Sequence, residues 1–204
     1  MSEICEYTSL SKHQIKKAAE VLRNAFQEDL TFKLLVPEDT ERQEMLYQLF
    51  KFLVKYGLKR GIIVSTPEIE GLSIWLPPKE VNISPWKAIL SGALSLVFNV
   101  SLKRLLAQKK IENFTSKLHK KLVSVPHWHF CVIGVDPAHQ GKGIGMRMIN
   151  YMTGRIDKER LLIYLETNLI KNVKFYNRFG FFLLHEDTIP DTDLTLYFML
   201  RNPK

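Results

Sequence analysis

Apolar residues recur at helical spacing in two segments near the start of the chain, and each segment predicts an amphipathic helix. The apolar face of the first would carry Ile15, Ala18, Ala19, Leu22, Ala25 and Phe26. The apolar face of the second would carry Met45, Leu46, Leu49, Phe52, Leu53 and Tyr56. Ser9 or Ser11 can cap the first helix and Thr40 the second, because their hydroxyls accept bonds from first-turn amides. Gly57 and Gly61 mark the end of the second helix.

Two short β-rich runs follow, "GIIVST" (61–66) and "GLSIWLP" (71–77), separated by "PEIE". This pattern predicts an antiparallel hairpin that ends at Pro77 and Pro78, since proline interrupts strand pairing. The segment 84–122 has a helical pattern again and is expected to form two helices.

The pattern changes from His127 onward, where strand-like and helix-like runs alternate. "HWHFCVIGV" (127–135) is a near-continuous apolar run, as expected for a central strand, and "LLIYLET" (161–167) has the same character. Between them, residues 144–156 place apolar side chains on one helical face. A further helix and two strands complete the expected order. The sequence therefore predicts an α/β fold containing a right-handed parallel crossover unit.

Composition indicates one globular domain in a reducing compartment. The chain has 204 residues, of which 46% are hydrophobic and 25% charged, enough to bury a sizeable core. Its two cysteines, Cys5 and Cys131, do not suggest a disulfide framework, so we expect a cytoplasmic protein. The first residues lack the pattern of a secretory signal. The longest apolar run, 88–100, is shorter than the roughly 20 residues that span a bilayer, so no membrane insertion is expected.

The formal charge of +8 is concentrated in the segment 101–122. Seven basic residues there stand against the single acidic residue Glu112. They are Lys103, Arg104, Lys109, Lys110, Lys117, Lys120 and Lys121. Such a helix could contact nucleic acid, a membrane surface or an acidic ligand, but a solvated helix face is the usual outcome. We expect no nucleic-acid binding.

The turn "VDPAHQGKGIGMRM" (135–148) contains glycines at 141, 143 and 145, between the first strand of the crossover unit and its helix. Glycines at such a turn let backbone amides point inward and let a ligand approach closely. Because the amides gather at the positive end of the helix, they suit a di- or polyphosphate. The spacing fits neither a Walker loop nor a dinucleotide fingerprint. A tight turn without a ligand is the alternative.

Two motifs in the second half of the chain resemble those of a known family. "VDPAHQGKGIG" resembles the acetyl-CoA pyrophosphate loop of the Gcn5-related N-acetyltransferase (GNAT) superfamily, with Gln140, Gly143 and Gly145 at the matching positions. About 30 residues later, "NVKFYNRFGF" (172–181) resembles the second signature of this superfamily. The resemblance covers 127–201 closely and the first half loosely. "GLSIWLPP" also resembles a subgroup similar to puromycin N-acetyltransferase.

The resemblance implies a mixed sheet of about six or seven strands, with a central splayed parallel pair flanked by helices. It implies one domain, 1–204, comprising N-terminal helices and a hairpin (1–83), a helical insertion (84–125) and an acetyl-CoA-binding core (126–201). The implied activity is acetyl transfer from acetyl-CoA to a primary amine, by direct attack in a ternary complex. We expect a small-molecule acceptor, because the insertion could cover a closed pocket, and a monomer or homodimer. A peptide or protein amine as acceptor, or a non-catalytic CoA-binding or interaction module, remains the alternative.

The resemblance also implies which residues bind the acyl donor. The pyrophosphate would lie on the loop residues Gln140, Gly141, Lys142, Gly143, Ile144 and Gly145. The pantetheine arm would bond to main-chain atoms of Ile133 and Val135, since peptide-like groups can extend a sheet, and to Asn172.

Two residues are candidates for proton transfer. The resemblance places an acid at Tyr176, which lies four residues after Asn172 and so on the same helix face. The alternative is a tyrosine that only packs in the core. Glu166, at the carboxyl end of the second parallel strand, is the candidate base, acting through water. It could instead be a salt-bridged structural carboxylate or a substrate-binding residue.

The first parallel strand places His127, His129 and Cys131 on one face. Side chains spaced about 7 Å apart along a strand do not converge on one ion, so no metal site is expected. These residues should line the cleft or pack in the core, and His129 is a candidate for substrate binding. Trp75 and Trp128 are expected to pack, although either could form an aromatic wall of the acceptor pocket, for which Trp75 is the candidate.

Overall fold

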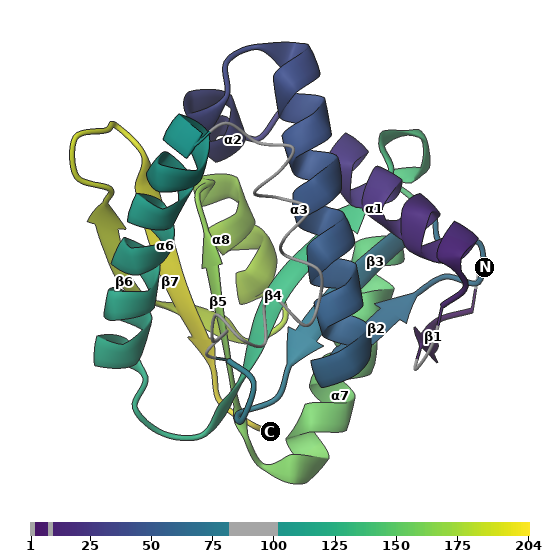
Figure 1. Ribbon diagram of the computed structural model, residues 1–204. Helices are drawn as coiled ribbons and strands as arrows, with labels where there is room; N and C mark the ends of the chain where they lie inside the picture. Colours follow the sequence, from purple (N-terminus) through teal and green to yellow (C-terminus); the bar gives the residue numbers. More distant parts are fainter. Residues whose placement is uncertain (1–2, 8–9, 82–101) are drawn as a thin grey trace.

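The computed structural model describes residues 3–7, 10–81 and 102–204, which form a seven-stranded mixed sheet between two layers of helices (Figure 1). The strand order is β1-β2-β3-β4-β5-β7-β6, and β4 and β5 are parallel while every other neighbouring pair is antiparallel. The strands are β1 (Cys5–Tyr7), β2 (Ile62–Ser65), β3 (Gly71–Leu76), β4 (His127–Val135), β5 (Leu162–Thr167), β6 (Phe181–Thr188) and β7 (Thr195–Arg201). The expected mixed α/β fold with a central parallel pair is confirmed.

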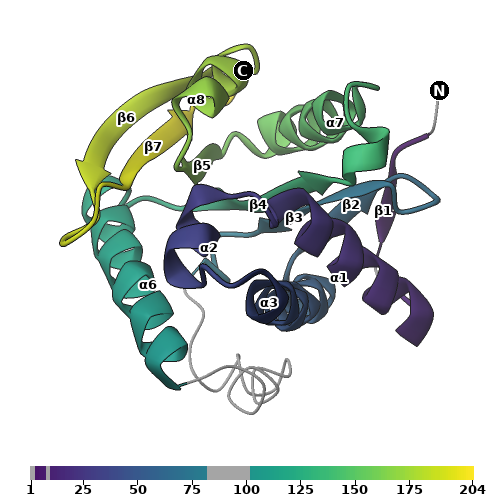
Figure 2. The same ribbon diagram turned by 90° about the horizontal axis from the view of Figure 1, so that it is seen from above.

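The helices divide between the two faces of the sheet. They are α1 (Lys12–Phe26), α2 (Leu30–Leu35), α3 (Asp39–Arg60), α6 (Leu102–Leu122), α7 (Ile144–Glu159) and α8 (Ile170–Asn177). Figure 2 shows α1, α2, α3 and α6 on one face and α7 and α8 on the other. Apolar clusters are buried on both faces of the sheet, two beneath α1, α3 and α6 and one beneath α7 and α8. Among the described residues, no helix is both long enough and apolar enough to cross a membrane.

The first half of the chain follows the predicted pattern with three differences. Ser11 caps α1 through a capping box with Gln14, as one of the two predicted alternatives. The second predicted helix begins one residue before Thr40, and Glu38 rather than Thr40 accepts its first amides, so that cap was assigned wrongly. The sequence does not predict α2 and β1, because apolar residues do not recur at a clear helix or strand spacing in these short segments. The hairpin β2–β3 is confirmed.

Only part of the expected helical insertion can be compared with the structure. The segment α6 accounts for the second of the two helices expected over 84–122. The first of them, including the apolar run 88–100, lies outside the described residues. The division of the chain at residues 84 and 125 therefore stays a prediction.

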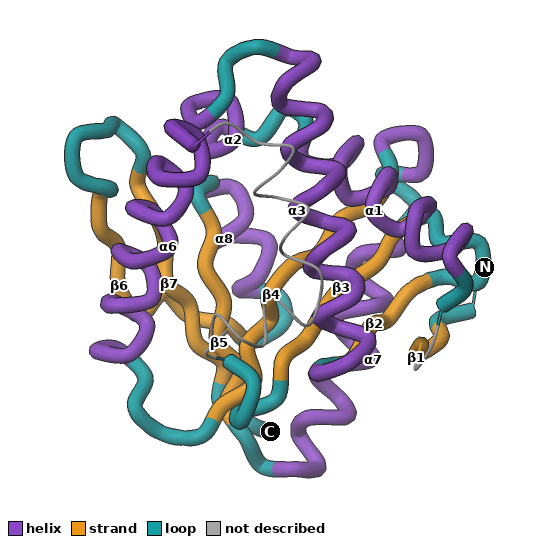
Figure 3. Tube along the Cα trace, viewed as in Figure 1, coloured by secondary structure: helices purple, strands orange, loops and turns teal. Residues whose placement is uncertain are grey.

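The two parallel strands separate soon after they begin to pair. They are in register only at His127 with Leu162, Trp128 with Ile163 and His129 with Tyr164. Figure 3 shows β4 and β5 diverging from the end at which they pair. Beyond His129, the edge of β4 that would face β5 has no neighbouring strand within the described parts of the chain.

A bulge on the other side of β4 accompanies this separation. On β3, Trp75 is opposite Phe130 and Ile74 is opposite Val132, so Cys131 has no partner in that pairing. The extra residue keeps Phe130 and Ile133 in the cluster beneath α7 and α8, while Cys131 and Val132 pack on the opposite face.

Candidate active site

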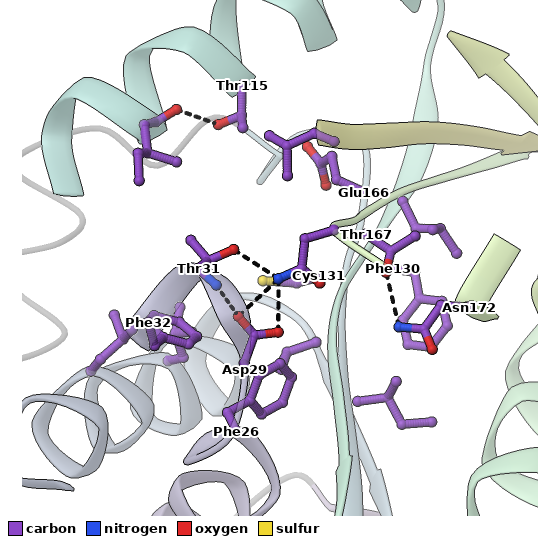
Figure 4. A pocket seen from close by; sticks show the side chains of 18 of the residues that line it. Phe26, Asp29, Thr31, Phe32, Thr115, Phe130, Cys131, Glu166, Thr167 and Asn172 are labelled. Carbon is purple, nitrogen blue, oxygen red and sulfur yellow. Dashed lines mark hydrogen bonds between the residues drawn. The ribbon is translucent and has the colours of Figure 1, made fainter. Parts of the chain in front are cut away.

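A cavity of about 290 Å³ lies where β4 and β5 separate (Figure 4). Its base is formed by residues 130–133 of β4 and by residues 165–168 at and after the end of β5. The helix α8 contributes Asn172 and Tyr176, and residues from α1, α2, α3 and α6 form the remaining walls. Ligands of open α/β sheets bind at the carboxyl ends of parallel strands, and this cavity has that position.

Glu166 lines this cavity and pairs with His129, which lies just outside the lining. The Nε2 atom of His129 lies 2.9 Å from Oε2 of Glu166, and both side chains are largely buried. Burial by itself raises the pKa of Glu166, but attraction to His129 and the hydrogen bond between them outweigh it, so the pKa lies below its usual value. The predicted base and the predicted substrate-binding histidine therefore form one pair, with the carboxylate ionised at neutral pH.

Two further histidines, His119 and His127, lie behind this pair. His119 and His129 line a second cavity of about 210 Å³ that shares Thr115, Cys131 and Glu166 with the first. The Nε2 atoms of His119 and His127 are 2.6 Å apart, and the His119 ring stacks on Tyr164. Burial lowers the pKa of His119 to about 4, which keeps its ring neutral at pH 7.

Sequence reasoning missed His119, because α6 was interpreted mainly as a basic, solvated helix. The signal was present in its apolar stripe, which packs on the sheet beside His119 and consists of Ile111, Phe114, Leu118 and Leu122. Burial raises the pKa of Cys131 to about 12, so this thiol is not a thiolate nucleophile at neutral pH. The described residues contain no group of three or more His, Cys, Asp or Glu that could hold a metal ion.

Asn172 and Tyr176 project from the same face of α8 into the cavity, as their spacing predicts. The Nδ2 atom of Asn172 donates a 2.9 Å hydrogen bond to Oγ1 of Thr167. The Tyr176 ring packs edge-on against Phe130 and Phe181. Burial raises the pKa of Tyr176, so the phenol keeps its proton at physiological pH. Within the described ranges, its hydroxyl makes no hydrogen bond to the protein.

The glycine turn forms a third cavity of about 230 Å³ at the N-terminus of α7. Gly141 and Gly143 adopt left-handed φ angles of 77° and 74°, and no side chain caps α7. In the part of the chain that the structure describes, the backbone amides of residues 141–146 have no hydrogen-bond acceptor. A Cβ at Gly141 would meet nothing within 4 Å. Unpaired amides, open space and the positive helix end fit a diphosphate.

The other predicted donor-binding residues surround this turn. The side chain of Gln140 donates to the carbonyl of Val135, which ties the turn to the end of β4. Lys142 is exposed, and Ile144 is buried at the start of α7. The side chains of Ile133 and Val135 pack beneath α7, while their backbone continues the part of β4 that β5 does not cover.

Trp75 packs in the core, one of the two roles that the sequence allowed. Its ring is fully buried and stacks on Phe130 at a centroid distance of 3.8 Å, and its indole N–H donates to Ser73. Trp75 and Trp128 are both absent from the described lining of the cavity between β4 and β5. We therefore leave Trp75 out of the acceptor site proposed below.

A polar group that sequence reasoning missed lies on the opposite wall of the cavity. The side-chain amide of Asn168 donates to both carboxylate oxygens of Asp29, each at 2.9 Å, and to Oγ1 of Thr31 at 2.8 Å. Asp29 also caps α2 by accepting a bond from the amide of Thr31. The cap has a sequence signal, but its contact with a residue 139 positions away has none.

Two basic side chains of α6 bond to groups elsewhere in the molecule. Arg104 donates to the carbonyl of Leu35 at 2.7 Å and lies 3.5 Å from Glu41. Lys110 pairs with Asp191 at 2.6 Å. These contacts dock α6 against its neighbours and account for two of its basic side chains.

Part of the chain matches a known family model, and one curated protein is similar over most of its length. Residues 108–182 match a family model described as an acetyltransferase (GNAT) domain. A Schizosaccharomyces pombe protein described as an uncharacterized N-acetyltransferase is 28% identical over 200 residues, covering 93% of this chain and 80% of that protein.

Two solved structures share the fold at low identity. One is described as histone acetyltransferase HPA2 and related acetyltransferase from Corynebacterium glutamicum, with a TM-score of 0.68, 22% identity and coverage of 100% and 98% of the two chains. The other is arylalkylamine N-acetyltransferase 2 from Aedes aegypti, with a TM-score of 0.57, 15% identity and coverage of 99% and 100%. These descriptions name different acceptors, so the shared fold does not decide the acceptor here. The matched domain and the yeast relative indicate an acetyltransferase of the GNAT type, and the solved structures share its fold.

Proposed function

We propose that this enzyme transfers an acetyl group from acetyl-CoA to a primary amine, by direct attack while both are bound. The observation that carries the proposal is the cavity at the point where β4 and β5 separate, with an unpaired amide cluster near the end of β4. Proteins of this superfamily generally use acetyl-CoA, which supplies the acetyl group as a thioester.

The residues that would hold acetyl-CoA are those of the glycine turn and of β4. The amides of residues 141–146 would bind the pyrophosphate at the positive end of α7. The backbone of Ile133 and Val135 would pair with the amides of the pantetheine arm, because β5 has already turned away there. Asn172, which lines the cavity, would add a side-chain hydrogen bond.

Glu166 and Tyr176 would move the two protons that the reaction requires. Glu166 accepts the proton that the amine loses as the C–N bond forms, directly or through water, while His129 holds the carboxylate in place. Tyr176 donates its proton to the sulfur as the C–S bond breaks, and burial keeps the phenol protonated for this purpose. The products are the acetylated amine and the free thiol of CoA.

We expect the acceptor to be a small molecule, because helices from several parts of the chain enclose the cavity. A peptide or protein amine is the competing acceptor, and a module that binds CoA without turnover is the competing function. Cytoplasmic location and a monomeric or homodimeric state remain predictions.

The test is release of the CoA thiol when the purified protein and acetyl-CoA are mixed with small amines or with peptides, with the products identified by mass spectrometry. Thiol release with small amines supports the proposal, and release only with peptides supports the competing acceptor. Tight binding of acetyl-CoA without release for any acceptor would indicate the non-catalytic module.

A further inference from the structure

The charged side chains that line the cavity between β4 and β5 are negative. Its lining contains two carboxylates, those of Asp29 and Glu166, and among the described lining residues there is no Lys, Arg or His. Figure 4 shows Asp29 and Glu166 on opposite sides of the cavity. A cation that enters lies between two negative groups, whereas an anion would be repelled from both sides.

The two carboxylates differ in how their charge is compensated. Glu166 has His129 as a direct partner. Asp29 is held only by neutral donors, Thr31 and Asn168, and forms no ion pair in the described parts of the chain. The nearest basic side chain on the same helix, Lys33, pairs instead with Glu28 on the surface. Asp29 therefore presents its charge to the cavity.

Three aromatic rings line the same cavity as this carboxylate. Phe26 and Phe32 meet edge to face at 6.1 Å, and each also contacts Phe50. All three rings line the cavity, and Figure 4 shows Phe26 and Phe32 on the same side of it as Asp29. Aromatic faces attract cations and also bury apolar area, so this corner suits an ammonium group or the apolar body next to one.

We propose that the acceptor is a cationic amine with an apolar body and no acidic group, and that Asp29 is the residue that selects for it. The inference rests on the acetyltransferase function proposed above and adds the substrate class. Amines whose carboxylate or phosphate lies near the reacting nitrogen are excluded by charge. The neighbouring cavity is lined by Lys120 together with the carboxylates of Glu112 and Glu166, so the experiment below measures the exclusion of acidic amines directly.

The experiment compares three ligands with the same amine and ring: 2-phenylethylamine, phenylalaninamide and phenylalanine. Phenylalaninamide has the size of phenylalanine without its negative charge, so the pair separates charge from bulk. Binding to the enzyme saturated with CoA is measured by calorimetry, and turnover with acetyl-CoA by thiol release. We expect phenylalanine to bind about tenfold or more weakly than phenylalaninamide, and 2-phenylethylamine to bind at least as well as the amide.

Asp29→Asn removes the charge while keeping a favourable N-cap for α2. The variant should bind 2-phenylethylamine about tenfold more weakly than the wild-type enzyme does. The difference in affinity between phenylalanine and phenylalaninamide should become smaller, and the affinity for acetyl-CoA should not change. Glu28→Gln is the matched control, because it removes a negative charge one residue away on the surface. Asp29→Ser, which also keeps a capping side chain, repeats the test if the Asn variant is unstable.

Equal binding of phenylalanine and its amide to the wild-type enzyme would overturn the inference, as would failure of both cationic amines to bind while acetyl-CoA binds. Loss of selectivity in Glu28→Gln but not in Asp29→Asn would overturn the role of Asp29. Failure of acetyl-CoA itself to bind would instead refute the proposed function, and the inference with it.

Discussion

The Nε2 atom of His129 and Oε2 of Glu166 lie 2.9 Å apart, at the point where β4 and β5 stop pairing. His129 is the last residue of β4 in register with β5, opposite Tyr164, and Glu166 follows Tyr164 on the same face of β5. The separation of the strands thus opens a cavity whose lining carries an ionised carboxylate that is paired with a histidine. This relationship makes Glu166 available as a proton acceptor in a site that is otherwise largely apolar.

Replacing His129 should change the pH dependence of the enzyme. The pKa of Glu166 lies below its usual value because of His129, so the base is ionised above that pKa and is lost as the pH falls through it. In His129→Leu the strongest of the interactions that lower this pKa is lost, whereas burial, which raises it, remains, so the pKa of Glu166 should rise. The ratio of kcat/KM between variant and wild type should therefore fall as the pH is lowered from about 8 to about 5.

We compare the ratio of the two kcat/KM values because ionisation of the amine substrate changes both values by the same factor, which cancels in the ratio. His185→Leu, on the strand β6 and outside the described cavity linings, is the matched control and should give a ratio independent of pH. A pH-independent ratio for His129→Leu would show that His129 does not control the ionisation of Glu166.

Tyr176→Phe should lower kcat by about 10²- to 10⁴-fold, with little change in the KM for acetyl-CoA, because the proton is needed only as the thiolate leaves. The effect should shrink with an acyl donor whose thiol is a better leaving group. Stability should change little, since the hydroxyl bonds to no group in the described ranges of the chain. Tyr197→Phe, on β7, is the control. A rate within about threefold of wild type would make Tyr176 a packing residue.

Local signals in the sequence were enough to predict the crossover unit that carries the glycine turn. The apolar run of β4, the helical period of α7 and the glycines between them predict one crossover unit, and the structure contains it. Asn172 and Tyr176 share a face because four residues make about one helical turn. These features depend on residues close together in the chain, so spacing predicts them.

Long-range contacts account for what the sequence did not predict. The bulge at Cys131 depends on which residue of β3 each residue of β4 meets, and the alternating pattern of β4 is compatible with several registers. Asp29 reaches Asn168 only because α2 packs above the end of β5. His119 joins the two β4 histidines only after α6 folds back on the sheet. Spacing along the chain contains none of this information.

Gly143→Val should weaken acetyl-CoA binding tenfold or more, because a branched side chain would occupy the space next to the unpaired amides. The left-handed φ of 74° also costs a non-glycine residue about 1–2 kcal/mol of stability. Gly180→Val controls for that strain, because Gly180 has a φ of 86° but lines none of the described cavities. Calorimetry that found equal affinity in the two folded variants would refute the pyrophosphate assignment.

Arg42→Met should destabilise the protein by about 3 kcal/mol or more, measured by urea denaturation. Arg42 is almost completely buried, and its guanidinium donates to the carbonyls of Gln27, Val36 and Pro37, which would lose their partner. Because these carbonyls flank α2, affinity for the acceptor should fall as well. Arg178→Met, at an exposed position, should change stability by less than about 0.5 kcal/mol. Equal stabilities of the two variants would refute the stabilising role of the Arg42 hydrogen bonds.

Hydrogen exchange with and without acetyl-CoA tests the central claim most directly, because the claim assigns the donor to amides that the protein itself leaves unpaired. Exchange should slow in two places at once, in residues 141–146 of the glycine turn and in residues 130–135 of β4, and should not change in β6. Protection of the glycine turn alone, with β4 unchanged, would contradict a donor bound between the separated strands. Protection confined to other segments would contradict the assignment of the whole site.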